Sequence, residues 1–225
     1  SLFADHMVLQ RAMPLPVWGW AEPGEDISVS FAGQSLRTSA GADGNWSVVF
    51  EPVISAEPQV MIVTGKNTIE IQDILLGEVW LCSGQSNMGV TVQESYNSTQ
   101  EIALAQYPKI RLYEVERRVC PKPDRTLGGT WTVCSPETAA NFTAVGYFFA
   151  RDIAEQLDVP VGLIHASWGG TPAEAWTDWE SLKKNANLKD LVERFKTACR
   201  EYPKNQAAFE EKIIEWERKA QIAKE

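Results

Sequence analysis

The chain has 225 residues, of which 44% are apolar and 23% are charged, a composition typical of a globular protein. Its 30 acidic side chains outnumber 21 basic ones, giving a net charge of -9 that argues against nucleic acid or an anionic membrane as a partner. The sequence contains no apolar run long enough to predict a membrane span. The length suits one large domain or two modest ones.

The N-terminal third has the pattern of short strands. Apolar and polar residues alternate over residues 27–31, 46–50 and 69–71, and glycine-containing turns separate these segments. This pattern predicts an antiparallel β-sandwich, an accessory domain over residues 1–76.

From Gly77 onward, strands and helices alternate. The unbroken apolar run at residues 79–82, bounded by glycines, predicts a strand buried on both faces. Further along the chain we expect a helix at 99–106, with a capping box at 98–101, and then a strand at 109–115. A loop follows over 117–141, which contains Pro121, Pro123 and a short strand at 130–134. A helix at 144–157 and a strand at 159–166 complete the pattern. This order predicts a parallel sheet in a partial three-layer α/β/α domain over residues 77–180.

The remaining residues, 181–225, have a helical pattern with mixed charge on the polar faces. A proline-containing segment at 201–205 divides the pattern into two amphipathic stretches. We therefore expect a helical hairpin, packed as an accessory element.

Ser86 is the main candidate for chemistry. It follows the carboxyl end of the strand at 78–83, where open α/β sheets place their sites, in a tight turn begun by Gly84. A serine held exposed in such a turn is how a hydrolase presents a nucleophile. The spacing is not that of a lipase-type elbow, because Met88 stands where that motif has glycine. The structural alternative is a helix cap, a common role for serine in turns.

Ester hydrolysis also needs N–H donors aimed at the developing oxyanion. The backbone N–H of Ser86 is one candidate. Another lies in the loop after the strand at 159–166, where Gly169 and Gly170 would let a backbone N–H approach an acyl oxygen without an intervening Cβ. These glycines would equally suit a turn with positive φ, which is compatible with the same role.

Several segments together resemble the sialate O-acetylesterase family of carbohydrate esterases, in the SGNH-hydrolase superfamily. The GQSN sequence at Gly84–Asn87 resembles the first block of that superfamily, and the likeness extends over residues 2–11, 16–21, 77–88 and 164–176. It implies a serine esterase that removes acetyl groups from sialic acids or from acetylated plant polysaccharides such as xylan. In this resemblance the glycine pair matches the second block, so Gly170 is assigned first and Gly169 second as oxyanion donors.

The catalytic base is not evident in the sequence. Only His6 and His165 are present, and His6 belongs to the predicted sandwich. His165, near the end of its strand, is a candidate base, although a structural role at the sheet edge is favoured. The resemblance implies a late DxxH motif and an asparagine block, and neither occurs here. We therefore expect an N-terminal portion of a longer enzyme, whose C-terminal part, a second chain or a missing segment, packs against an uncovered sheet edge.

Candidates for substrate binding follow the glycine pair. Trp176 would stack on a sugar ring and Glu174 would accept hydrogen bonds from sugar hydroxyls, although each also suits a packing or ion-pairing role. Gln85 and Asn87 are further candidates beside the serine. The alternative from another class is a non-catalytic sugar-binding module that uses the β-sandwich.

No metal, nucleotide or other cofactor is implied, because no ligand-spaced cluster and no phosphate loop occurs. Cys120 and Cys134 flank the loop and are candidates for a disulfide. The chain starts at Ser1 without an initiator methionine, as if a preceding segment had been removed or left out. We expect an extracytoplasmic location, periplasmic or secreted.

Overall fold

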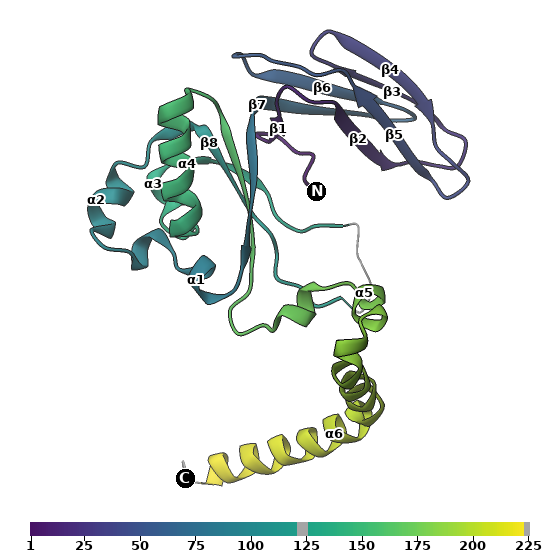
Figure 1. Cartoon of the computed structure of the whole chain (residues 1–225), viewed down its shortest axis with the longest axis vertical. Helices are drawn as coiled ribbons and strands as arrows, with labels where there is room; N and C mark the ends of the chain where they lie inside the picture. Colours follow the sequence, from purple (N-terminus) through teal and green to yellow (C-terminus); the bar gives the residue numbers. More distant parts are fainter. Residues whose placement is uncertain (121–125, 223–225) are drawn as a thin grey trace. The chain divides into compact units, whose positions relative to one another are not determined.

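A computed structural model describes residues 1–120 and 126–222 of the chain, so the predicted loop residues Pro121 and Pro123 lie outside the described part. The chain divides into two compact units, Ser1–Gly170 and Thr171–Glu225. The first unit contains every strand shown in Figure 1.

The first unit begins with two layers of strands, as the alternating pattern predicts. One layer pairs β2 (Leu15–Trp20) with β5 (Asn45–Phe50). The other has the order β4 (Gln34–Ser39), β3 (Asp26–Phe31), β6 (Gln59–Thr64) and β7 (Thr68–Gly84), all antiparallel, and β1 (Val8–Gln10) runs parallel to β7. Side chains from both layers meet in a single core that includes Val17, Phe31, Phe50, Met61 and Ile74. The predicted β-sandwich is confirmed.

Strand β7 continues from the sandwich into a parallel sheet. It is 17 residues long, and its second half, from Glu78 to Gly84, pairs parallel with β10 (Val161–Ser167). β10 in turn pairs parallel with β8 (Tyr107–Glu114), and β9 (Trp131–Cys134) closes this end antiparallel to β8. The result is the mixed sheet of an α/β protein.

Helices cover one face of this sheet (Figure 1). The longest is α4 (Ala144–Leu157), with the bounds that its apolar periodicity predicts. It begins after Thr143, whose hydroxyl accepts a hydrogen bond from the N–H of Gly146, and it buries Tyr147 and Ala150 in the core beneath β8 and β10. The shorter helices are α1 (Ser86–Gly89), η1 (Val92–Glu94), α2 (Ser98–Ala103) and α3 (Pro136–Ala139).

Two local predictions in this unit are wrong. The apolar run in β7 is not buried on both faces, because Trp80 is 45% and Leu81 is 66% exposed. In its second half β7 pairs only with β10 among the described residues, so it is an edge strand there and not a central one. The expected capping box is also absent, because α2 starts at Ser98 and its N-cap is Asn97, which adopts a left-handed conformation.

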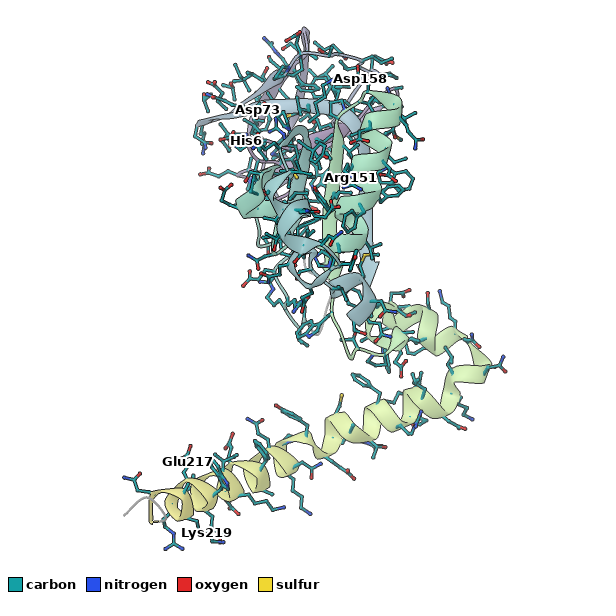
Figure 2. All side chains as sticks on the ribbon, turned by 90° about the vertical axis from the view of Figure 1, so that its left-hand side faces the viewer. His6, Asp73, Arg151, Asp158, Glu217 and Lys219 are labelled. Carbon is teal, nitrogen blue, oxygen red and sulfur yellow. The ribbon has the colours of Figure 1, made fainter. Side chains whose placement is uncertain are left out.

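An arginine–aspartate pair joins the sandwich to the parallel sheet. Arg111 of β8 donates both terminal nitrogens to the carboxylate of Asp73 in β7, and His6 shares that carboxylate through Nδ1 at 2.6 Å (Figure 2). Arg111 is buried, and its guanidinium holds the pKa of Asp73 below the usual carboxyl range. Asp73 has a positive φ of 54°, a backbone conformation that is unfavourable for most residues other than glycine. The bonds from Arg111 and His6 to its side chain help to stabilise that conformation.

The second unit is helical, with η2 (Ala173–Trp176), α5 (Trp179–Lys184), η3 (Ala186–Leu188) and α6 (Lys189–Ile222). The predicted hairpin is wrong, because α6 is a single helix that contains Pro203 (Figure 1). Proline removes one backbone hydrogen bond, but this stretch of helix is exposed, so water can satisfy the freed carbonyl. No helix among the described residues is long and apolar enough to cross a membrane.

Candidate active site

Ser86 lies where two parallel strands end together. The register aligns Gly84 at the end of β7 with Ser167 at the end of β10, and the N–H of Trp168 donates to the Gly84 carbonyl at 3.1 Å. Gly84 has a φ of 141°, a conformation that favours glycine, and the chain then turns into α1. Ser86 is the first residue of α1, so its predicted position just past the strand is the one observed.

The side chain of Ser86 has no capping role. The N-cap of α1 is Gln85, and no side chain caps this helix. Among the described residues the Ser86 hydroxyl accepts or donates no hydrogen bond, and the residue is exposed. The hydroxyl is therefore available to a substrate and a base.

An open pocket of about 330 Å³ contains the serine. Its walls come from the turn and helix after β7, from the loop after β8 and from the loop after β10, which are three neighbouring strand ends. The lining residues are Ser86, Gly89, Val90, Glu94, Arg117, Trp168 and Gly169. This is the edge of the sheet at which α/β proteins place their ligands.

The glycine pair has one member against the serine. A Cβ placed on Gly169 would lie 3.4 Å from the Cα and 3.5 Å from the Cβ of Ser86, so a single methyl group would fill the space between this backbone and the serine. Gly170 has a φ of 77°, and a Cβ placed on it would meet nothing within 4 Å. Gly169 thus lines the pocket, whereas Gly170 provides the positive φ of the turn; which N–H is the oxyanion donor stays a prediction.

The other predicted site residues have separate locations. Gln85 and Asn87 flank Ser86 in the turn and are exposed, but neither lines the pocket. Glu174 and Trp176 lie in η2 of the second unit. Trp176 is 50% exposed, and its indole N–H donates to the hydroxyl of Thr171 at 2.8 Å. A role of this half-exposed indole in sugar binding stays a prediction.

His165 is the buried centre of a hydrogen-bonded chain that also contains Ser167 and the exposed Glu114. Its Nδ1 lies 2.6 Å from the carboxylate of Glu114, and its Nε2 lies 2.6 Å from the hydroxyl of Ser167. With the proton on Nδ1 the ring donates to the Glu114 carboxyl oxygen, and Nε2 accepts from the Ser167 hydroxyl. His165 is only 3% exposed, and with both ring nitrogens engaged it has the structural role at the sheet edge that the sequence favours.

Neither histidine forms a hydrogen bond with Ser86 in the described structure. His6 contacts Asp73, and His165 contacts Glu114 and Ser167. Ser167 resembles a nucleophile in this arrangement, but it is 4% exposed and its hydroxyl faces Gly89 of α1. The Ser167–His165–Glu114 chain thus reaches the pocket lining through the approach of the Ser167 hydroxyl to Gly89.

Sequence reasoning missed five lining residues, namely Gly89, Val90, Glu94, Arg117 and Trp168. Glu94 accepts from the backbone N–H and the hydroxyl of Thr91, both at 2.8 Å, and these bonds lower its pKa, so it stays ionised as part of a helix cap. Arg117 follows the end of a predicted parallel strand, which was the available signal. Trp168 directly precedes the glycine pair.

None of the four cysteines is among the lining residues of the pocket. All four cysteines are free, with Cys82 and Cys134 buried and Cys120 exposed, so the suggested Cys120–Cys134 disulfide is not formed. Burial raises the pKa of the Cys82 thiol to about 11 and that of Cys134 to about 12. Within residues 1–120 and 126–222, no group of three or more potential ligand side chains is arranged to hold a metal ion.

Comparisons with known proteins point to one family. A family model described as carbohydrate esterase, sialic acid-specific acetylesterase, matches residues 76–209. Sialate O-acetylesterases from Rattus norvegicus and Homo sapiens are 32% and 34% identical over 204 residues, covering 81% of this chain and 38% and 39% of their own lengths. The chain thus spans about two fifths of the length of these curated relatives.

A solved structure agrees with this result. The crystal structure of a carbohydrate acetylesterase from Xanthomonas citri matches 82% of this chain and 43% of its own, with a TM-score of 0.78 and 39% identity. The likeness therefore extends to both the sequence and the fold.

Proposed function

Because the chain belongs to the sialic acid-specific acetylesterase family of carbohydrate esterases, we propose that it carries the nucleophile of a serine esterase that removes O-acetyl groups from carbohydrates, foremost from sialic acids. The observation that carries this proposal is that Ser86 and the Gly169 backbone line one open pocket at two parallel strand ends, with room for only a methyl group between them. A free serine beside an approachable backbone is the arrangement that acyl transfer requires.

The reaction proceeds through an acetyl-enzyme. The Ser86 oxygen attacks the acetyl carbonyl carbon while a base takes its proton, and the carbonyl oxygen becomes an oxyanion. Backbone N–H groups of Ser86 and of the glycine pair, Gly170 first and Gly169 second, donate to that oxyanion. The intermediate expels the sugar oxygen, which takes the proton from the base. Water then attacks the acetyl-enzyme and releases acetate and free Ser86.

The base and its acidic partner come from residues outside this chain. Both histidines of the chain hold other partners, which supports this assignment. The free edge of β7 with the exposed Trp80 and Leu81 offers a surface on which such a segment would pack, either as a continuation of the same chain or as a second chain.

The test is a Ser86→Ala variant of the full-length enzyme, assayed for acetate release from O-acetyl sialic acid and from an aryl acetate. Activity should fall by at least about 1,000-fold, and labelling by a fluorophosphonate should disappear. Ser83→Ala, which removes an exposed hydroxyl three residues earlier in β7, is the matched control and should retain both.

Other outcomes would favour the rival functions. A wild-type protein that binds sugars but is neither labelled nor active would be a binding module. Faster acetate release from acetylated xylan than from O-acetyl sialic acid would support an esterase whose substrate is xylan and not sialic acid. The 225-residue chain alone should not turn over aryl acetates, and robust turnover by it would refute an external base.

A further inference from the structure

The pocket around Ser86 has one cationic side chain among its described lining residues, that of Arg117. This is unexpected in a chain with a net charge of -9. A cation beside a nucleophile in an acidic protein creates a local preference for anionic ligands.

Arg117 is held through the Nε of its guanidinium. Its Nε donates to the backbone carbonyl of Ser167 at 3.2 Å, at the end of β10. Ser167 is itself fixed through its hydroxyl by His165. The anchor therefore rests on a buried strand end, and it places the guanidinium at the pocket wall.

The terminal nitrogens of Arg117 hydrogen-bond to no other described residue. In contrast, Arg111 and Arg151 are each paired with a carboxylate, from Asp73 and Glu101 respectively. A guanidinium held by Nε retains two terminal N–H₂ groups in a plane, which suits a carboxylate of an incoming ligand.

The acidic lining residue, Glu94, is not paired with the guanidinium of Arg117 in the described structure. Its carboxylate binds the backbone N–H and hydroxyl of Thr91, and it forms no ion pair with Arg117 within the described structure. The pocket thus contains one carboxylate committed to a helix cap and one guanidinium able to bind a ligand.

We propose that Arg117 is a specificity-determining residue, which binds the carboxylate of an acidic O-acetylated sugar while Ser86 attacks its acetyl ester. This inference rests on the proposed function and narrows it, because neutral acetylated sugars such as xylan would lack the anchoring group. Arginine and lysine are not equivalent at such a site, because only the guanidinium offers a planar two-point contact.

The experiment compares two forms of one substrate with the full-length enzyme. Acetate release is measured from O-acetyl sialic acid and from its carboxyl methyl ester, which has the same ring and acetyl group but no negative charge. The wild-type enzyme should favour the acid in kcat/KM. Arg117→Gln should lower this acid-to-ester ratio by about 10- to 100-fold, the usual range for a lost charged hydrogen bond, mainly through KM.

Two further variants complete the design. Arg117→Lys should have an acid-to-ester ratio between those of Arg117→Gln and the wild type, because lysine keeps the positive charge but lacks the planar two-point contact of the guanidinium. Arg118→Gln is the matched control, because that side chain donates to the carbonyl and hydroxyl of Thr126 and does not line the pocket; its ratio should equal that of the wild type.

Three results would overturn the inference. A wild-type enzyme with no preference for the acid would refute it while leaving the esterase intact. If Arg117→Gln lowered kcat/KM equally for the acid and the ester, Arg117 would have a structural or oxyanion-stabilising role and not one in carboxylate binding. The same loss of ratio in Arg118→Gln would show a general charge effect. Absence of any esterase activity in the wild type would instead refute the proposed function.

Discussion

Replacement of Gly169 by valine tests the geometry of the site most directly. An alanine Cβ at this position would lie 3.4 and 3.5 Å from Ser86 carbons, at the near edge of the roughly 3.5–4.0 Å range preferred by carbon pairs. Valine adds branches about 1.5 Å farther out. A branch directed at Ser86 would come within about 2 Å of it, so the serine turn would have to move by about 1 Å.

A displacement of this size should be costly for catalysis and mild for folding. Misplacing a reacting group by about 1 Å lowers rates by about 100-fold, which equals about 2.7 kcal/mol of transition-state free energy. Gly169 does not have a positive φ and is exposed, so the free energy of unfolding should change by less than about 1 kcal/mol. Gly169→Ala should have a smaller effect, about tenfold on kcat/KM.

The assay is kcat/KM for an aryl acetate with the full-length enzyme, alongside thermal unfolding. Gly170→Ala provides a contrast, because its φ of 77° predicts a loss of about 1–2 kcal/mol in the free energy of unfolding. If Gly169→Val kept kcat/KM within about twofold of the wild type, Gly169 would not lie against the working serine. A valine variant that failed to fold would equally contradict the small change in unfolding free energy expected at this exposed position.

Three other predictions concern stability and reactivity. Arg111 lowers the folded-state pKa of Asp73, so this pair stabilises the protein at neutral pH, and its contribution is lost as the pH falls through the ordinary carboxyl range towards the lowered value. Urea unfolding at about pH 7 and about pH 3 should show a smaller pH dependence for Asp73→Asn, and an unchanged one would refute the assignment. Gly77→Ala should prevent folding or cost several kcal/mol, because its Cβ would lie 2.0 Å from a backbone carbonyl oxygen; a circular dichroism melt like that of the wild type would contradict this. A thiol reagent at about pH 8 should modify the two exposed cysteines quickly and Cys82 and Cys134 only after unfolding, and rapid reaction of all four would refute their burial.

The parts of the fold that could be predicted from sequence are those where local and long-range preferences agree. Helix α4 has a hydroxyl cap at Thr143 and an apolar face that the sheet buries, and both of its predicted bounds are correct. The serine turn was predictable for a similar reason, since Gly84 supports a sharp turn and the next parallel strand ends beside it.

The errors arise where tertiary context overrides the local signal. Pro203 predicts a break, yet exposure to water lets α6 continue through it. Trp80 and Leu81 have the composition of a central strand, but burial depends on what lies across the sheet edge, which a window of sequence does not contain. Arg117 was missed because a charged residue in a loop is usually solvated, and only the register of β10 with β7 and β8 brings it to the serine.

The continuity of β7 limits where this protein could be divided or recombined. The boundary predicted between residues 76 and 77 falls inside a strand whose two halves belong to different sheets. A break there would separate the sandwich from the serine turn, but it would cut a hydrogen-bonded strand and expose unpaired strand edges in both sheets. The sandwich and the Ser86 turn thus form one covalent and hydrogen-bonded unit, unlike modules joined by a linker, and designs that add a new N-terminal module should join it before β1.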